Sequence, residues 1–206
     1  RVRFGEALGS LFSRPAFVLA LLFWGLLGVG GWAVMGWMPT YLNEQFKLSQ
    51  GAAGLSATGY VNVASLLGMV IGGAWADRWS RTNPRARILV PIIGLCVAAP
   101  GILLASTTTL LPVALGALVC YGLARSFTDA NMMPILCQIA DPRYRATGYG
   151  VLNFFACVVG GVTIYAGGAL RDANVDISRV FQFAAGSIAF CAILMFVIRR
   201  QTEAKA

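Results

Sequence analysis

Residues 15–43 read PAFVLALLFWGLLGVGGWAVMGWMPTYLN, and this stretch contains no charged side chain. A helix of about 20 apolar residues is long enough to cross the roughly 30 Å hydrocarbon core of a bilayer. The glycines within the stretch suit membrane helices that pack closely, where small residues let backbones approach. The stretch therefore predicts a membrane-spanning helix near 16–42.

Further charge-free runs follow at 48–76, 88–124, 146–170 and 180–198. The run 88–124 is too long for one span, and the polar sequence Ser106–Thr109 divides it. The sequence thus predicts an all-α membrane protein with six transmembrane helices, near 16–42, 52–76, 88–105, 110–139, 146–170 and 180–198. Residues 1–15 are expected to form a linker with a short amphipathic helix, and residues 199–206 a polar tail.

Composition supports a membrane protein and excludes several other classes. Of the 206 residues, 58% are hydrophobic and 12% charged, and the mean hydropathy is +0.72, which is too apolar for the surface of a soluble enzyme. The net charge of +8 does not indicate a nucleic-acid partner, because the charges fall in short clusters between apolar runs. The sequence holds no His, and its five cysteines lie in those runs without a CxxC motif, so no metal site or other cofactor is expected.

The positions of the basic residues predict which side of the membrane each loop faces. If the N-terminus is cytoplasmic, the outer loops hold only Lys47, Arg171 and Arg179. The cytoplasmic segments would then hold twelve basic residues: Arg1, Arg3, Arg14, Arg78, Arg81, Arg85, Arg87, Arg143, Arg145, Arg199, Arg200 and Lys205. This strong positive-inside bias places both termini in the cytoplasm.

The end of the second predicted helix and its loop carry a distinctive pattern, GGAWADRWSR at 72–81. An Asp at a helix C-terminus meets the negative end of the helix dipole, so Asp77 needs a positive partner: a nearby arginine or the N-terminus of a neighbouring helix. Gly68 and Gly72 stand four residues apart and would let another helix approach closely.

This segment resembles the loop signature of the major facilitator superfamily, G-x-x-x-D-R-x-G-R-[KR]. The matching residues are Gly73, Asp77, Arg78 and Arg81, whereas Ser80 and Thr82 depart from the pattern. A basic loop that only sets topology is the alternative interpretation. Segments 36–42 and 144–150 are similar to the sugar-phosphate and organic-anion permease branch of that family.

The resemblance implies a twelve-helix transporter of which this chain is the C-terminal six-helix half. It further implies that an N-terminal half is the partner of this half. A small-molecule substrate would bind between the two halves and cross the membrane by alternating access. The loop at 72–81 would act as a latch that holds one conformation. A bacterial inner membrane is the location that the family suggests. Symport driven by protons or sodium ions is compatible with this family.

Arg125 and Asp129 are the first candidates for a substrate site. They stand four residues apart on one face of the fourth predicted helix, with Arg125 near the bilayer midplane. A charge at that depth is expensive unless it faces a cavity or a partner. The pair is either an internal lock or a site that binds substrate or a coupling proton, and a guanidinium there favours an organic anion.

Five further residues complete the candidate site. The resemblance places the first and fourth helices around the central cavity, which brings in Trp24 and Trp32 on the first helix and Asn131 on the fourth. Asn62 and Asn153 belong to polar stripes on the second and fifth helices, for which hydrogen bonding between helices is the alternative explanation.

The sequence therefore predicts a secondary active transporter, not an enzyme, for a small anionic organic solute. No nucleophile–base pair, paired-acid site or phosphate-binding loop is visible. A membrane sensor or scaffold on the same half-fold is the main alternative, and a six-helix channel is another. Flux into proteoliposomes, and its saturation, would separate these possibilities.

Overall fold

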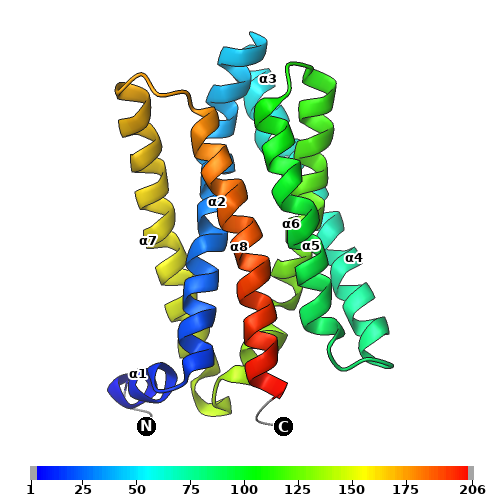
Figure 1. Ribbon diagram of the computed structural model, residues 1–206, viewed down its shortest axis with the longest axis vertical. Helices are drawn as coiled ribbons and strands as arrows, with labels where there is room; N and C mark the ends of the chain where they lie inside the picture. The colour runs from blue at the N-terminus through cyan, green and yellow to red at the C-terminus, as the bar shows by residue number, and fades with distance from the viewer. Residues whose placement is uncertain (1–3, 204–206) are drawn as a thin grey trace.

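The computed structural model describes residues 4–203, and within that range all regular structure is helical (Figure 1). Six helical segments in it are long and apolar enough to cross a membrane, which confirms the predicted fold class. The helices are α1 (Phe4–Phe12), α2 (Pro15–Phe46), α3 (Gln50–Gly54), α4 (Tyr60–Ser80), α5 (Ala86–Thr107), α6 (Leu111–Ile139), α7 (Arg145–Asp172) and α8 (Ser178–Glu203).

Four of the six expected ranges lie within a single longer helix, namely 16–42, 88–105, 146–170 and 180–198. The range 110–139 begins one residue before α6, and the range 52–76 begins in α3 and ends in α4. The segment expected as a polar tail begins as a helix, because α8 continues to Glu203, and residues 204–206 lie outside the described part of the chain. The short N-terminal helix is α1, whose residues Ala7 and Leu11 are buried against the bundle.

The second span has a feature that the sequence did not predict. A π-helical turn, Leu55–Gly59, joins α3 to α4, so the span runs from Gln50 to Ser80 with one irregular turn. The hydroxyl of Thr58 donates to the carbonyl of Gly54 at 2.7 Å within this turn. Such turns widen a helix locally and often occur at functional sites.

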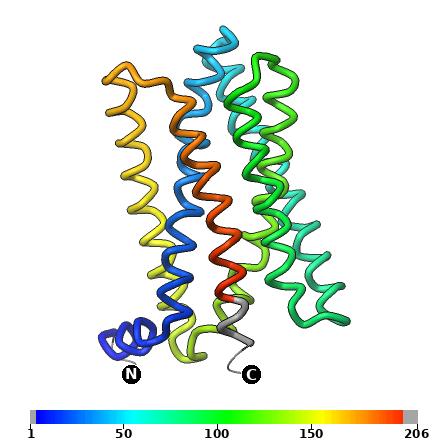
Figure 2. Tube along the Cα trace, viewed as in Figure 1, coloured from blue at the N-terminus to red at the C-terminus, as the bar shows by residue number. Residues whose placement is uncertain are grey.

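The packing of the bundle has an internal symmetry (Figures 1 and 2). The spans α4 and α6 pack together, as do α2 and α7, and α5 contacts α6 as α2 contacts α8. Exchanging the first three spans for the last three relates the α4–α6 contact to the α7–α2 contact and the α5–α6 contact to the α8–α2 contact, with α5 and α8 in contact across the middle; only the α4–α5 contact has no comparable counterpart among the described spans. This is the pattern expected of inverted three-helix repeats.

Glycines on α4 bring it close to α6, as the sequence predicted. A Cβ atom at Gly68 would collide with the carbonyl oxygen of Leu123, and one at Gly72 would lie 2.8 Å from the Cα of Phe127. Neither helix has room for a side chain at these crossings. The close approach positions α6 against α4 along the wall of the cavity described below.

Side chains of α2 and its N-cap tie both ends of this helix to other helices. At the end where both chain termini lie, Arg14 donates to the carbonyl of Ile139 at 3.2 Å, and its guanidinium lies 3.8 Å from the carboxylate of Asp141. At the opposite end, the buried hydroxyl of Tyr41 donates to the carbonyl of Ser106 at 2.8 Å. The helix continues through Pro39 without a break.

Candidate functional site

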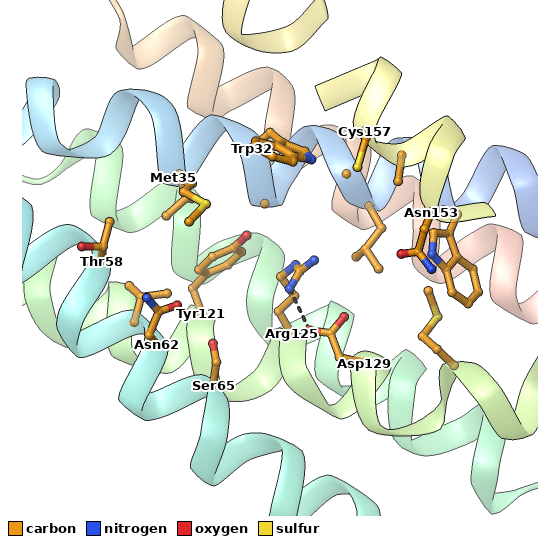
Figure 3. A pocket seen from close by; sticks show the side chains of 18 of the residues that line it. Trp32, Met35, Thr58, Asn62, Ser65, Tyr121, Arg125, Asp129, Asn153 and Cys157 are labelled. Carbon is orange, nitrogen blue, oxygen red and sulfur yellow. Dashed lines mark hydrogen bonds and ion pairs between the residues drawn. The ribbon is translucent and has the colours of Figure 1, made fainter. Parts of the chain in front are cut away.

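A cavity of about 370 Å³ lies among α2, the π-helical turn with α4, α6 and α7 (Figure 3). The indole rings come from α2, the charged pair and a phenol from α6, and amide and hydroxyl side chains from α4, the π-helical turn and α7. The side chains that line the cavity include those of Trp24, Trp32, Met35, Thr58, Asn62, Ser65, Tyr121, Arg125, Asp129, Asn153 and Cys157.

The charged part of the cavity is the ion pair on α6. Arg125 Nη1 donates to Asp129 Oδ2 at 2.8 Å, and the side chains retain 22% and 29% of their full exposure. Partial exposure on the cavity wall means that both charges face a space that a solute or water can enter. The pair therefore locks one turn of α6 and lines the cavity at once, so the two interpretations of these residues are compatible.

Glycine on α2 makes room for the guanidinium. A Cβ atom at Gly31 would lie 3.3 Å from Arg125 Nη2, and one at Gly30 would lie 3.6 Å from the hydroxyl of Tyr121. The two glycines thus allow α6 side chains to reach the backbone of α2. The sequence analysis expected these glycines to allow close helix packing and did not connect them with Arg125.

Both tryptophans proposed from sequence line the cavity. The indole of Trp24 meets the ring of Tyr149 edge-on, with centroids 6.2 Å apart. Trp32 packs over Gly160 of α7, where any side chain would collide with its ring. These contacts hold flat aromatic surfaces in place, which suits a solute with an apolar body.

Two of the three candidate asparagines lie at the cavity. Asn62 of α4 lines it, and Asn153 of α7 lines it while donating to the carbonyl of Tyr149 at 3.0 Å. Asn131 does not line it, because its side chain is buried and donates to the carbonyl of Phe127 at 2.9 Å. Its position supports a structural role within α6 rather than the predicted contact with solute.

Tyr121 is the residue that the sequence analysis missed. It lies one turn before Arg125 on the same face of α6, so the spacing of four residues was the available signal. Its hydroxyl is buried and has no hydrogen-bond partner within the described structure. Thr58 and Ser65 also line the cavity, and Ser65 donates to the carbonyl of Gly122 at 3.2 Å.

The loop signature lies away from the cavity, where α4 ends and α5 begins. The partner of Asp77 is Arg87, at 2.9 Å, in the first turn of α5. The side chain of Asp77 retains 64% exposure, so the pair bridges the α4–α5 loop at the surface. Gly73 lies beside α6, with a Cβ position 3.8 Å from the Cβ of Ala130. Arg78 and Arg81 lie at the end of α4 in the same segment.

Metal binding was not expected from sequence. In the part of the chain that the structure describes, no group of three or more His, Cys, Asp or Glu side chains is arranged to hold a metal ion. The cavity is lined by charged, hydroxyl, amide, aromatic, thiol and thioether side chains.

Comparison with known proteins places these observations in a family context. Residues 1–164 match the family model described as Major Facilitator Superfamily. An MFS-type efflux pump of Mycolicibacterium smegmatis (strain ATCC 700084 / mc(2)155) is 27% identical over 172 residues, which is 81% of this chain and 39% of that protein.

Solved structures share the fold at low sequence identity. A bacterial homologue of the human lysosomal transporter Spinster, inward-facing and occupied, is similar with a TM-score of 0.69 and 16% identity, over 92% of this chain and 50% of that one. The D-xylose-proton symporter is similar with a TM-score of 0.62 and 17% identity, over 88% of this chain and 46% of that one. The chain thus spans half or less of the length of these relatives.

Proposed function

Because this chain belongs to the major facilitator superfamily, whose members are transporters rather than enzymes, we propose that it is the C-terminal half of a secondary transporter. The proposed solute is a small organic anion that binds at the cavity and crosses by alternating access between two halves. The proposed location is the cytoplasmic membrane of a bacterium, with both chain termini on the cytoplasmic side.

The observation that carries this proposal is the position of Arg125. The residue lies in the middle of α6, a span of 29 residues, and its guanidinium faces the cavity rather than lipid. A cation at that depth is stabilised by a counter-ion or by an anionic solute. Guanidinium donors match the geometry of carboxylate and phosphate groups, which supports an anionic solute.

The exposed faces of two spans support a partner half. In the most apolar windows of the α3–α4 span and of the span ending in α7, only 28% and 17% of residues are buried, against at least 50% in the other four spans. These two spans flank the cavity, and α2 and α6 form the rest of its wall. An N-terminal six-helix half would cover these faces and enclose the cavity between the halves.

Coupling is proposed to use Asp129. It was the one acidic residue within the expected spans, and it faces the cavity beside Arg125. A proton or sodium ion there would alter the charge that the solute meets, which is how symport would be driven. The relatives include a protein named as an efflux pump and one named as a symporter, so flux has to be measured in both directions.

The proposal is tested with the full-length protein in proteoliposomes. We expect uptake of a labelled organic anion that saturates with concentration and shows counterflow, whereas a channel would give neither. The variant Arg125→Ala should lose uptake, with Gly116→Ala on the same helix as the control, since a Cβ atom there would meet no atom within 4 Å. Wild-type protein without flux of any anion would favour the sensor or scaffold alternative.

A further inference from the structure

Besides the hydroxyl of Thr128, which does not line the cavity, two buried donor atoms on α6 have no partner in the described structure, and both belong to residues of the cavity wall. They are the hydroxyl of Tyr121 and Nε of Arg125, each shielded from solvent and without a hydrogen bond in the described structure. Tyr121 retains only 2% of its exposure. An unpaired buried donor lowers stability, so two of them within one helical turn of the cavity wall indicate a partner that arrives from outside the chain.

The two donors face the same place on α2. Figure 3 shows the hydroxyl of Tyr121 and the guanidinium of Arg125 pointing toward α2. There Gly30 and Gly31 lie over them, with Cβ positions 3.6 Å from Tyr121 Oη and 3.3 Å and 3.8 Å from Arg125 Nη2 and Nε. Asp129 occupies the other end of the guanidinium through Nη1. The Nε–Nη2 edge is therefore the part of Arg125 that remains for a ligand.

We propose that Tyr121 Oη and the Nε–Nη2 edge of Arg125 form a carboxylate subsite that α2 closes at Gly30–Gly31. This inference rests on the proposed function and names the atoms that would hold the solute. The two nitrogens of one guanidinium edge match the two oxygens of a planar carboxylate, and the phenol adds a third donor. Asp129 keeps its contact with Nη1 and acts as a positioning residue that orients this edge.

Access to the subsite requires α2 to move away from α6 locally. The packing permits this movement, since α2 packs mainly against α7 and α8 and makes few contacts with α6. A shift of α2 would expose both donors without breaking the α4–α6 or α5–α6 contacts. Carboxylate binding and movement of α2 are therefore linked, because only the shifted state offers both donors to the ligand.

The first test variant is Tyr121→Phe in the full-length protein. Loss of one hydrogen bond to a charged group should weaken carboxylate binding about tenfold. The melting temperature should stay the same or rise, because the variant removes an unsatisfied hydroxyl. If the Tyr121 hydroxyl served only to stabilise the fold, Tyr121→Phe would instead lower the melting temperature.

The second variant is Gly31→Ala, which places a methyl group against the Nε–Nη2 edge without changing any charge. We expect a similar loss of affinity. Gly116→Ala is the matched control, since a Cβ atom at Gly116 on α6 would meet no atom within 4 Å. That control should bind as the wild type does.

The probes are benzoate and hexanoate, each paired with its neutral primary amide, titrated calorimetrically against purified protein. Wild-type preference for the acids, weakened in both variants, would support the subsite. Unchanged affinity in Tyr121→Phe would overturn the subsite, and so would weaker binding together with a lower melting temperature. The proposed function would still stand in either case if Arg125→Ala abolished binding. A wild type with no preference for the acids over their amides would overturn both.

Discussion

Arg125 and Asp129 form an ion pair of 2.8 Å within a single turn of α6, and both side chains line the same cavity. The pair is electrically neutral, so it stabilises each charge inside the membrane region. An anion that binds beside it makes the site net negative. A proton or sodium ion at Asp129 would restore neutrality, which is what the proposed coupling requires.

Variants of Arg125 should show that its effect on uptake is separable from its effect on thermal stability. We expect Arg125→Ala to abolish uptake, and to lower the melting temperature because Asp129 is left without its partner. The double variant Arg125→Ala/Asp129→Asn should regain thermal stability but not uptake. Uptake in proteoliposomes and the melting temperature are measured for both variants. Normal uptake in either variant would rule Arg125 out as a solute contact.

Asp77 should affect turnover more than binding. The variant Asp77→Asn removes the exposed pair with Arg87, which contributes no more than about 1 kcal/mol to stability. We expect kcat for transport to fall while KM and melting temperature change little, measured by initial rates in proteoliposomes. The charge swap Asp77→Arg/Arg87→Asp should recover part of the rate; unchanged kinetics in Asp77→Asn would contradict the latch.

The α4–α6 crossing should tolerate no side chain at Gly68. Gly68→Ala would drive a methyl group into the backbone carbonyl of Leu123, and we expect a loss of about 1–3 kcal/mol. Gly73→Ala, on the same helix, meets only the Cβ of Ala130 at 3.8 Å and should fold normally. Thermal unfolding in detergent compares them, and equal melting temperatures would contradict the packing described.

Asp176 should stabilise the start of α8 in a pH-dependent way. The backbone N–H of Ser178 donates to Asp176 at 2.8 Å and holds the pKa of its carboxyl below the ordinary value, helped by the Ser178 hydroxyl and the charge of Arg179. Since the folded pKa is lowered, the stabilisation is present above the ordinary carboxyl pKa and is lost as the pH falls through the folded value.

The variant Asp176→Asn makes this dependence measurable. The amide hydrogen exchange of the first turn of α8 should differ between wild type and variant at neutral pH. The difference should shrink as the pH falls through the lowered pKa of Asp176 and disappear at the acidic pH where the carboxyl is protonated in both folded and unfolded states. A difference that persists at that pH would show that the charge of Asp176 is not responsible.

Hydrophobic runs were sufficient to predict the spans, because each apolar helix must by itself be long enough to cross the hydrocarbon core of a bilayer. Glycine spacing on α4 similarly predicted a close helix crossing. The position of Asp77 at a helix C-terminus predicted a positive partner, either a nearby arginine or the N-terminus of a neighbouring helix. The sequence did not show the π-helical turn Leu55–Gly59, since its five residues have ordinary helix patterning. Nor did it exclude Asn131, whose amide bonds to its own helix.

The sequence by itself determined what lies along each helix: the apolar lengths, the basic loops, and the charges at Arg125 and Asp129, since these are properties of local composition and spacing. Only the tertiary structure decided which side chains meet across helices. It brought Gly30 and Gly31 over Tyr121 and Arg125, and it paired Asp77 with Arg87. Such contacts depend on how each helix is rotated and where it crosses its neighbours, which the sequence of a single helix does not determine. They place the charged pair of α6 beside residues of other helices in one candidate site.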